Sequence, residues 1–264
     1  MFPPAYADSS DDPSPLSSPE IIEGRVETGI LLLCDHASNA VPAGLNQLGM
    51  PPAEMARHIA FDIGAADVTR TMARLLGAPA ILTRFSRLLI DPNRGRDDPT
   101  LVMRLSDGAL VLGNARLTEA QISARIATYY DPYDSAIEAA IKAGMAAGFP
   151  PMILSIHSFT PAWKGVPRPW HIGVLWDRDT RLARPLIEAL QAQADLIVGD
   201  NEPYGGGLPD DTIDRHTTRA GLANALIEIR QDLIGDLASA QAWGERLSQV
   251  MQDVLRNGLR QAAA

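Results

Sequence analysis

Short, continuous apolar runs alternate with longer helical patterns from about residue 28 onward. A short run of this kind is typical of a strand buried on both faces of a sheet, and apolar residues at three- and four-residue steps indicate a helix. We expect strands over 29–34, 80–83, 88–90, 152–156, 171–176, 196–198 and 225–230. We expect helices over 52–77, 118–148, 179–194 and 237–261, the second of them broken at Asp131-Pro132. Strands that alternate with helices predict an α/β domain with a largely parallel sheet.

The N-terminal segment differs from the rest in composition. Five prolines, five serines and three aspartates lie within the first 19 positions. Such a segment buries too little apolar surface to offset the entropy lost on ordering, so we expect a flexible arm over 1–22 and a single α/β domain over 23–264. The arm has neither the basic and apolar regions of a secretory signal nor the arginines of a transit peptide, so we expect a cytoplasmic protein.

Charge and hydropathy narrow the classes of partner. The chain of 264 residues has 23 basic and 32 acidic residues and a net charge of −9. This balance disfavours binding to nucleic acid or to an anionic membrane surface, although local arginines can still bind a small anion. The run Ile30–Cys34 is far shorter than the roughly 20 residues of a membrane-spanning helix. Cys34 is the only cysteine, which excludes an internal disulfide and any metal site built from several cysteines.

Polar residues follow, or lie within, three of the expected strands. His36 comes directly after one buried run, His157 directly after another, and Glu228 lies inside a third. Ligands of open α/β sheets bind at the carboxyl ends of strands, where two histidines can meet at one zinc ion and a nearby carboxylate can accept a proton from water. The same residues also fit a structural interpretation, in which the histidines bond to loops and Glu228 pairs with Arg230. Asp62 would then lie on an exposed face of a helix.

Three arginines lie close together in the segment 84–94. Guanidinium groups form bidentate bonds to carboxylates, so Arg87 or Arg94 could hold an anionic substrate. Alternatively, Asp91 and Arg94 close a turn whose backbone is fixed by Pro92. The glycine-rich stretch at 200–207 fits either a lid or a plain connector, and it lacks the lysine of a phosphate-binding loop.

Four short motifs, in this order, resemble those of the N-formylglutamate amidohydrolase family. They are 34–42 (CDHASNAVP), 84–94 (RFSRLLIDPNR), 155–158 (SIHS) and 226–231 (LIEIRQ). The resemblance covers about 29–233 and implies a three-layer α/β/α sandwich with a mixed, largely parallel central sheet, similar to zinc carboxypeptidases and aspartoacylases. It also implies one Zn²⁺ ion at the ends of the strands.

The same resemblance implies a role for individual residues. His36 and His157 would hold the zinc ion, and Glu228 would be the base that activates water. Asn93 and Arg94 would grip the substrate carboxylate. Related enzymes often carry a glutamate three residues after the first histidine, where this chain has Asn39, so Asp62 is the expected third ligand. The further substrate contacts that we expect are Arg87, His216 and Arg230.

The resulting expectation is a zinc-dependent hydrolase of a small anionic N-acyl amino acid. N-formyl-L-glutamate is the expected substrate, cleaved to formate and glutamate in a step that ends histidine breakdown. We expect a monomer or a small homo-oligomer. One alternative is a module without catalytic activity that binds an acidic metabolite through Arg87 and Arg94. Another is a metal-free hydrolase with Ser158 as nucleophile, although no G-x-S-x-G motif is present.

Overall fold

A mixed seven-stranded sheet forms the centre of the protein in the computed structural model, which describes residues 15–262. The spatial order of the strands is β1 (Glu20–Ile22), β3 (Ala80–Leu82), β2 (Ile30–Cys34), β6 (Met152–Phe159), β11 (Asn224–Arg230), β9 (Ile172–Leu175) and β10 (Val198–Asp200). The pairs β1–β3 and β9–β11 are antiparallel, and the other four pairs are parallel. The predicted mixed, largely parallel sheet is therefore confirmed.

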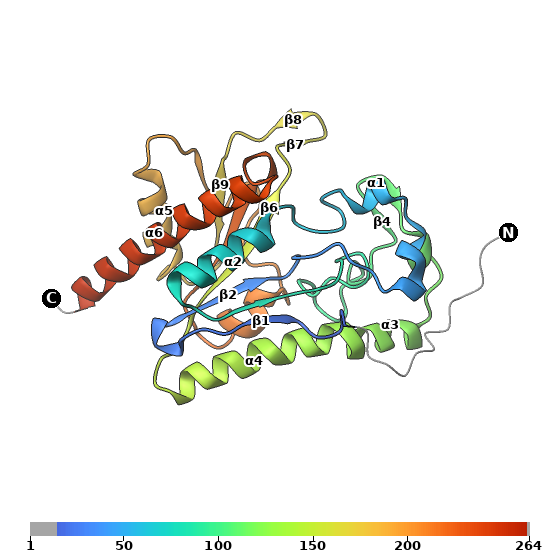
Figure 1. The fold of residues 1–264 in the computed structure, drawn as a ribbon, viewed down its shortest axis with the longest axis horizontal. Helices are drawn as coiled ribbons and strands as arrows, with labels where there is room; N and C mark the ends of the chain where they lie inside the picture. Colours follow the sequence, from blue (N-terminus) through green and yellow to red (C-terminus); the bar gives the residue numbers. More distant parts are fainter. Residues whose placement is uncertain (1–14, 263–264) are drawn as a thin grey trace.

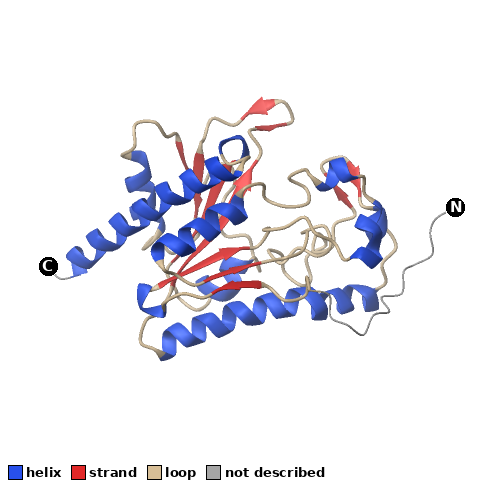
Figure 2. Cartoon of the chain, in the orientation of Figure 1, coloured by secondary structure: helices blue, strands red, loops and turns tan. Residues whose placement is uncertain are grey.

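Helices cover both faces of this sheet (Figures 1 and 2). The helices α2 (Ala65–Leu76), α5 (Ala183–Gln191) and α6 (Leu237–Ala262) pack on one face, and α4 (Asp131–Ala146) packs on the other. Alternate residues of a strand point to opposite faces of the sheet. Because helices cover both faces, the strands carry apolar side chains on both. The predicted three-layer architecture is confirmed.

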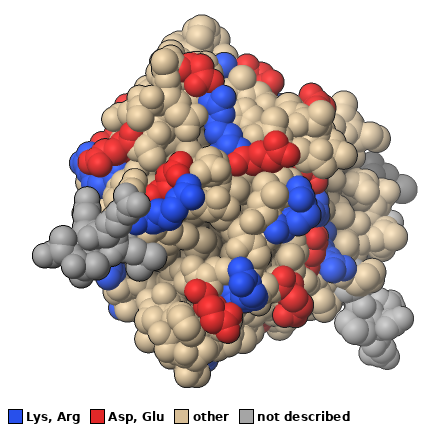
Figure 3. All heavy atoms as spheres, turned by 60° about the vertical axis from the view of Figure 1, so that its left-hand side comes forward, with Lys and Arg blue, Asp and Glu red and all other residues tan. Residues whose placement is uncertain are grey.

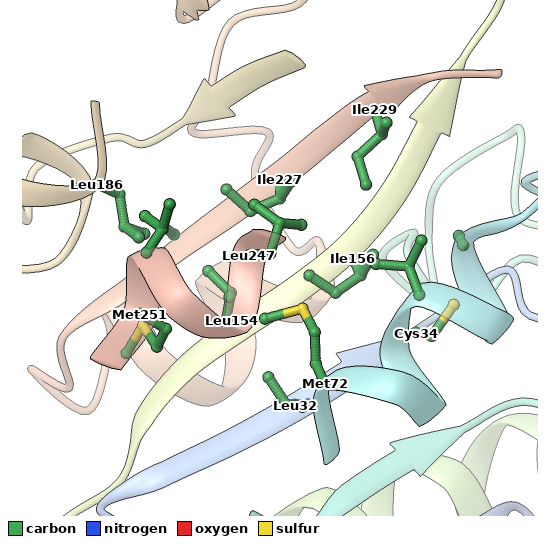
Figure 4. Packing of buried hydrophobic residues seen from close by; sticks show 14 of the residues in the cluster. Leu32, Cys34, Met72, Leu154, Ile156, Leu186, Ile227, Ile229, Leu247 and Met251 are labelled. Atoms are coloured by element: carbon green, nitrogen blue, oxygen red, sulfur yellow. The ribbon is translucent and has the colours of Figure 1, made fainter. Parts of the chain in front are cut away.

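The larger of the two packed faces is shown in Figure 4. Met72 of α2 and Leu247 and Met251 of α6 lie over strand residues that include Leu154 and Ile227. All five side chains are at most 2% exposed. At about 1.5–3 kcal/mol for each large apolar side chain removed from water, this layer is a main source of the folding free energy.

Two of the helix predictions are wrong in detail. The stretch 52–77 is not one helix, because only α1 (Pro52–Met55) and α2 are helical and an irregular segment separates them. Gly64 in that segment has φ of +79°, and a Cβ atom there would lie 2.1 Å from the carbonyl oxygen of Ile234. Only glycine fits this close approach, and the turn that it allows brings Asp62 to the edge of the sheet.

The break expected at Asp131-Pro132 is also absent. A π-helical turn (Ile126–Tyr130) joins α3 (Glu119–Arg125) directly to α4. Pro132 cannot donate the usual backbone hydrogen bond, and the wider π-helical turn just before it lets the helical path continue past this residue.

The strand predictions need two corrections. Leu88 and Leu89 lie in a turn and Ile90 in irregular chain. All three are buried, and they pack in a separate apolar cluster that includes Tyr129 and Tyr130. The sheet also begins earlier than expected, because β1 lies inside the segment 1–22 that we assigned to the arm. The prediction for residues 1–14 lies outside the described residues.

Two small hairpins and the surface complete the description. The hairpins are β4 (Leu105–Ser106) with β5 (Ala109–Leu110) and β7 (Ala162–Trp163) with β8 (Val166–Pro167). On the face shown in Figure 3, basic and acidic side chains lie next to one another rather than in separate patches. Within residues 15–262, none of the helices combines the length and the apolar character that crossing a membrane requires.

Candidate metal centre

Three neighbouring strands bring the predicted site residues to one edge of the sheet. His36 follows β2, His157 lies in β6, and Glu228 lies in β11 directly opposite His157 in the strand register. Asp62 comes from the irregular segment before α2, where its backbone N–H donates to the carbonyl of His36 at 2.9 Å. The parallel pairing of these strands explains why residues so far apart in sequence meet here.

Three possible ligand atoms converge at this edge. Asp62 Oδ2 lies 3.3 Å from His36 Nδ1 and 2.8 Å from His157 Nδ1, and all three atoms lie within 4.8 Å of one another. The two imidazole rings are 5.0 Å apart between centroids. Donor atoms of a tetrahedral site with bonds of 2.0–2.1 Å lie about 3.3 Å apart. The spacing of these buried atoms therefore fits a single small cation.

The outer nitrogen of each histidine is held by another carboxylate. His36 Nε2 lies 2.7 Å from Asp91 Oδ1, and His157 Nε2 lies 2.9 Å from Asp35 Oδ2. A carboxylate oxygen accepts a hydrogen bond, so each Nε2 carries the proton and a neutral ring presents its Nδ1 lone pair to Asp62. The two Nδ1 lone pairs and the oxygen of Asp62 would repel one another, so a positive charge must lie between them.

A proton can supply that charge when no metal is bound. Burial opposes protonation of His157, but the hydrogen bonds to Asp35 and Asp62 outweigh it and raise the pKa of His157 well above its usual value. The pKa of Asp62 is lowered despite its burial, because both histidines favour the ionised form. A divalent cation and a proton therefore compete for the same position.

Asp35 is the most extensively bonded carboxylate of the site. Besides His157, it accepts hydrogen bonds from Tyr133 (2.9 Å), Ser155 (2.9 Å) and Thr212 (2.8 Å). These bonds fix both oxygens of Asp35 and, through them, the orientation of the His157 ring.

Asp91 orients the ring of His36 as Asp35 orients that of His157. Its other oxygen accepts from Arg87 Nη2 at 2.7 Å. Burial would raise the pKa of Asp91, but Arg87 and His36 together hold it well below its usual value. Asp91 is therefore ionised at neutral pH and keeps His36 in one tautomer.

Glu228 has a different environment from these carboxylates. Its side chain is 8% exposed, and Oε2 is buried without a hydrogen-bond partner among the described residues. Burial raises the pKa of Glu228 to about 8, and the negative charge of Asp62 acts in the same direction. The positive charges of His157, Arg87 and Arg168 offset only part of this rise. A buried carboxylate without a partner is costly to the fold, which is typical of a functional group.

A cavity of about 390 Å³ opens onto these residues. His36, Asp62, His157 and Glu228 line it, and so do the predicted substrate-binding residues Arg87, Asn93 and Arg94. Its volume lies within the range of about 300–1,000 Å³ that is usual for small-molecule sites.

The arginines of this cavity are not equivalent. Arg87 donates to Asp91 and lies 3.6 Å from Asp62, so its charge is largely neutralised within the protein. Arg94 donates only to the carbonyl of Asn93, at 2.8 Å, and pairs with no carboxylate in the described part of the chain. Asn93 in turn accepts from the backbone N–H of Thr212. Arg94 is therefore the better placed of the two arginines for an anionic ligand.

The structure does not bring all the predicted residues together. His216 Nε2 lies 2.7 Å from Asp134, and Arg230 pairs with Asp232; neither His216 nor Arg230 lines the cavity. The amide of Asn39 donates to a backbone carbonyl at 2.8 Å and is likewise absent from the lining. We therefore do not retain His216 and Arg230 as substrate contacts.

Ser158 does not form a nucleophile–base pair either. Its hydroxyl donates to the carbonyl of Ile63 at 2.9 Å, while both nitrogens of the adjacent His157 face carboxylates. This arrangement gives the serine hydrolase alternative no support.

Sequence reasoning missed the carboxylates that support the two histidines. Asp35 and Asp91 both belong to the motifs quoted above, but their importance depends on contacts with His157 and His36 that cross 122 and 55 positions of sequence. A carboxylate that immediately precedes a histidine at the end of a strand was the one available signal.

Comparisons with known proteins agree with this geometry. A sequence profile described as N-formylglutamate amidohydrolase matches residues 28–235. The crystal structure of a gene product from Agrobacterium tumefaciens is 33% identical and superposes with a TM-score of 0.85, over 91% of this chain and 95% of that one. An N-formylglutamate amidohydrolase from Ralstonia eutropha is 21% identical, with a TM-score of 0.66 over 87% of this chain and 94% of that one. A search of curated protein sequences finds no significant match.

Proposed function

Because the chain belongs to the N-formylglutamate amidohydrolase family, we propose that it hydrolyses the amide bond of a small N-acyl amino acid with the help of one divalent cation. N-formyl-L-glutamate is the proposed substrate, and Zn²⁺ is the proposed ion. The observation that carries the proposal is the convergence of His36 Nδ1, His157 Nδ1 and Asp62 Oδ2 beside the buried carboxylate of Glu228. A cytoplasmic location and a place at the end of histidine breakdown belong to the same proposal.

The ligand set suits zinc, which accepts imidazole nitrogen and carboxylate oxygen. His36, Asp62 and His157 would hold the ion. When bound, it would polarise the acyl carbonyl and make a water molecule more acidic.

Glu228 moves the proton in this scheme. Its carboxylate takes a proton from the attacking water and passes it to the nitrogen of the leaving amine. The C–O bond forms first, as water adds to the carbonyl carbon, and the C–N bond breaks once the amine nitrogen carries the proton, so the products are formate and glutamate. Arg94 holds the α-carboxylate of the substrate with a charge-assisted hydrogen bond inside the partly enclosed cavity.

The pKa of Glu228 gives a pH-dependent prediction. In the metal-free protein it is raised to about 8, so Glu228 loses its proton only as the pH rises through that value. A nearby cation favours the ionised form, and we expect zinc to lower this pKa by about one unit or more. NMR titration of protein labelled at the glutamate carboxyl carbons, with and without zinc, measures the difference. The same pKa in both states would contradict the proposed proximity of ion and base.

Asp91→Asn tests the support of His36. An amide in place of the carboxylate holds the ring less strongly, and we expect zinc affinity to fall by about 10- to 100-fold. Competition with a chromophoric chelator measures this affinity, and circular dichroism checks that the variant is folded. Asp253→Asn, on α6 with a side chain that is 48% exposed, is the matched control and should leave affinity unchanged. Unchanged affinity in Asp91→Asn would show that this contact does not support a ligand.

A panel of N-formyl and N-acetyl amino acids, assayed on zinc-loaded protein, tests the function itself. We expect N-formyl-L-glutamate to have the highest kcat/KM. Hydrolysis of none of these compounds would contradict the proposal.

A further inference from the structure

A second arginine without a carboxylate partner lies next to the cavity. Most arginines of this acidic protein form ion pairs, including Arg87, Arg215 and Arg230. Arg168, which directly follows β8 of the β7–β8 hairpin at the top of Figure 1, forms none with the residues that the structure describes. Its side chain instead contacts three residues that line the cavity: Phe159, Thr160 and Tyr204.

The guanidinium group of Arg168 is held in one orientation. Nη1 donates to Thr160 Oγ1 and to the hydroxyl of Tyr204, both at 3.0 Å. The group also stacks on the rings of Phe159 (5.7 Å), Trp163 (5.6 Å) and Tyr204 (4.9 Å). These contacts restrict a side chain that would otherwise move freely, and they leave its charge uncompensated.

The remaining donors of Arg168 form one free edge. All its side-chain hydrogen bonds within residues 15–262 come from Nη1, so the edge formed by Nε and Nη2 has no partner there. That edge presents two parallel N–H groups, the geometry that matches the two oxygens of a carboxylate. Arg230 helps to fix the backbone of Arg168, because its Nη1 donates to the carbonyl of Arg168 at 3.2 Å.

We propose that Arg168 binds the side-chain carboxylate of the substrate and so makes the enzyme selective for dicarboxylic N-acyl amino acids. This inference deepens the proposed function and rests on it. The α-carboxylate lies next to the scissile amide, so its partner must lie close to the metal ligands. Arg94 does, since it follows the turn whose Asp91 contacts His36. The side-chain carboxylate lies two bonds further from the amide nitrogen, which suits an arginine that is in direct contact with the cavity-lining residues Phe159 and Tyr204.

The test compares two substrates that differ only in this charge, N-formyl-L-glutamate and N-formyl-L-glutamine. In Arg168→Gln we expect kcat/KM for the glutamate compound to fall by about 10- to 100-fold, since bonds between charged groups contribute this much. For the glutamine compound we expect a change below about threefold. Arg168→Lys should keep part of the preference. Arg246→Gln is the matched control, because Arg246 also stacks on a tryptophan, Trp243, but pairs with Asp195, and neither of these partners lines the cavity.

Equal losses on both substrates would overturn the inference, because they would show that Arg168 only supports the hairpin. Calorimetry with L-glutamate and L-glutamine repeats the comparison without turnover. Weaker binding of glutamate alone in Arg168→Gln would support the inference even if no hydrolysis were detected, a result that would contradict only the proposed function. Unchanged glutamate binding would overturn the inference whatever the activity.

Discussion

Replacement of Glu228 by glutamine is expected to lower kcat/KM by about 10²- to 10⁴-fold while leaving the protein at least as stable as before. The amide has the size of the carboxylate but cannot accept a proton from water. The gain in stability follows from burial. Because the pKa of Glu228 is raised to about 8, folding at neutral pH must either add a proton to this carboxyl group or bury its charge at Oε2, which has no hydrogen-bond partner in the described structure. Steady-state kinetics and thermal unfolding measure the two effects on the same protein.

Glu188→Gln is a suitable control for this experiment. Glu188 lies on α5, is exposed and does not line the cavity, so both activity and stability should stay the same. If Glu228→Gln kept more than about a tenth of the activity, a general base at this position would be ruled out.

Replacement of His157 by alanine is expected to remove the cation and the activity together. The variant loses one of three ligand atoms and also leaves Asp35 buried without its charged partner. Breaking such a pair costs about 3–5 kcal/mol, and the low end applies here because Tyr133, Ser155 and Thr212 still donate to Asp35. Metal content after dialysis and urea unfolding measure the two losses.

A double variant separates the two causes. Asp35→Asn combined with His157→Ala removes the unpaired charge, so part of the lost stability should return. The ion should stay absent, because a ligand is still missing. Retention of the metal by His157→Ala would remove His157 from the ligand set.

The central sheet and the two histidines could be predicted because they depend on local patterns. Continuous apolar runs predicted the main strands, and the polar residues His36 and His157 close to the ends of such runs predicted the edge of the sheet onto which the cavity opens. Leu88–Ile90 shows the limit of this reasoning, since an apolar run can be buried in loops as well as in a sheet.

Asp62 depends on tertiary structure and could not be placed by periodicity. It falls in a stretch with helical spacing, but the close approach of Gly64 to Ile234 and the hydrogen bond from the Asp62 backbone to His36 hold the chain at the sheet. Arg168 is a similar case, because its aromatic partners come from two separate parts of the chain, 159–163 and Tyr204. In contrast, His216 and Arg230 lie near predicted motifs in sequence but point to partners outside the cavity.

The metal content of the purified protein, measured together with its activity before and after chelation, tests the central claim most directly. We expect about one equivalent of a divalent ion, zinc foremost, loss of hydrolysis when the ion is removed, and recovery when zinc is returned. Full hydrolytic activity in protein that contains no divalent ion would contradict the assignment of His36, Asp62 and His157 as the ligands of a catalytic metal.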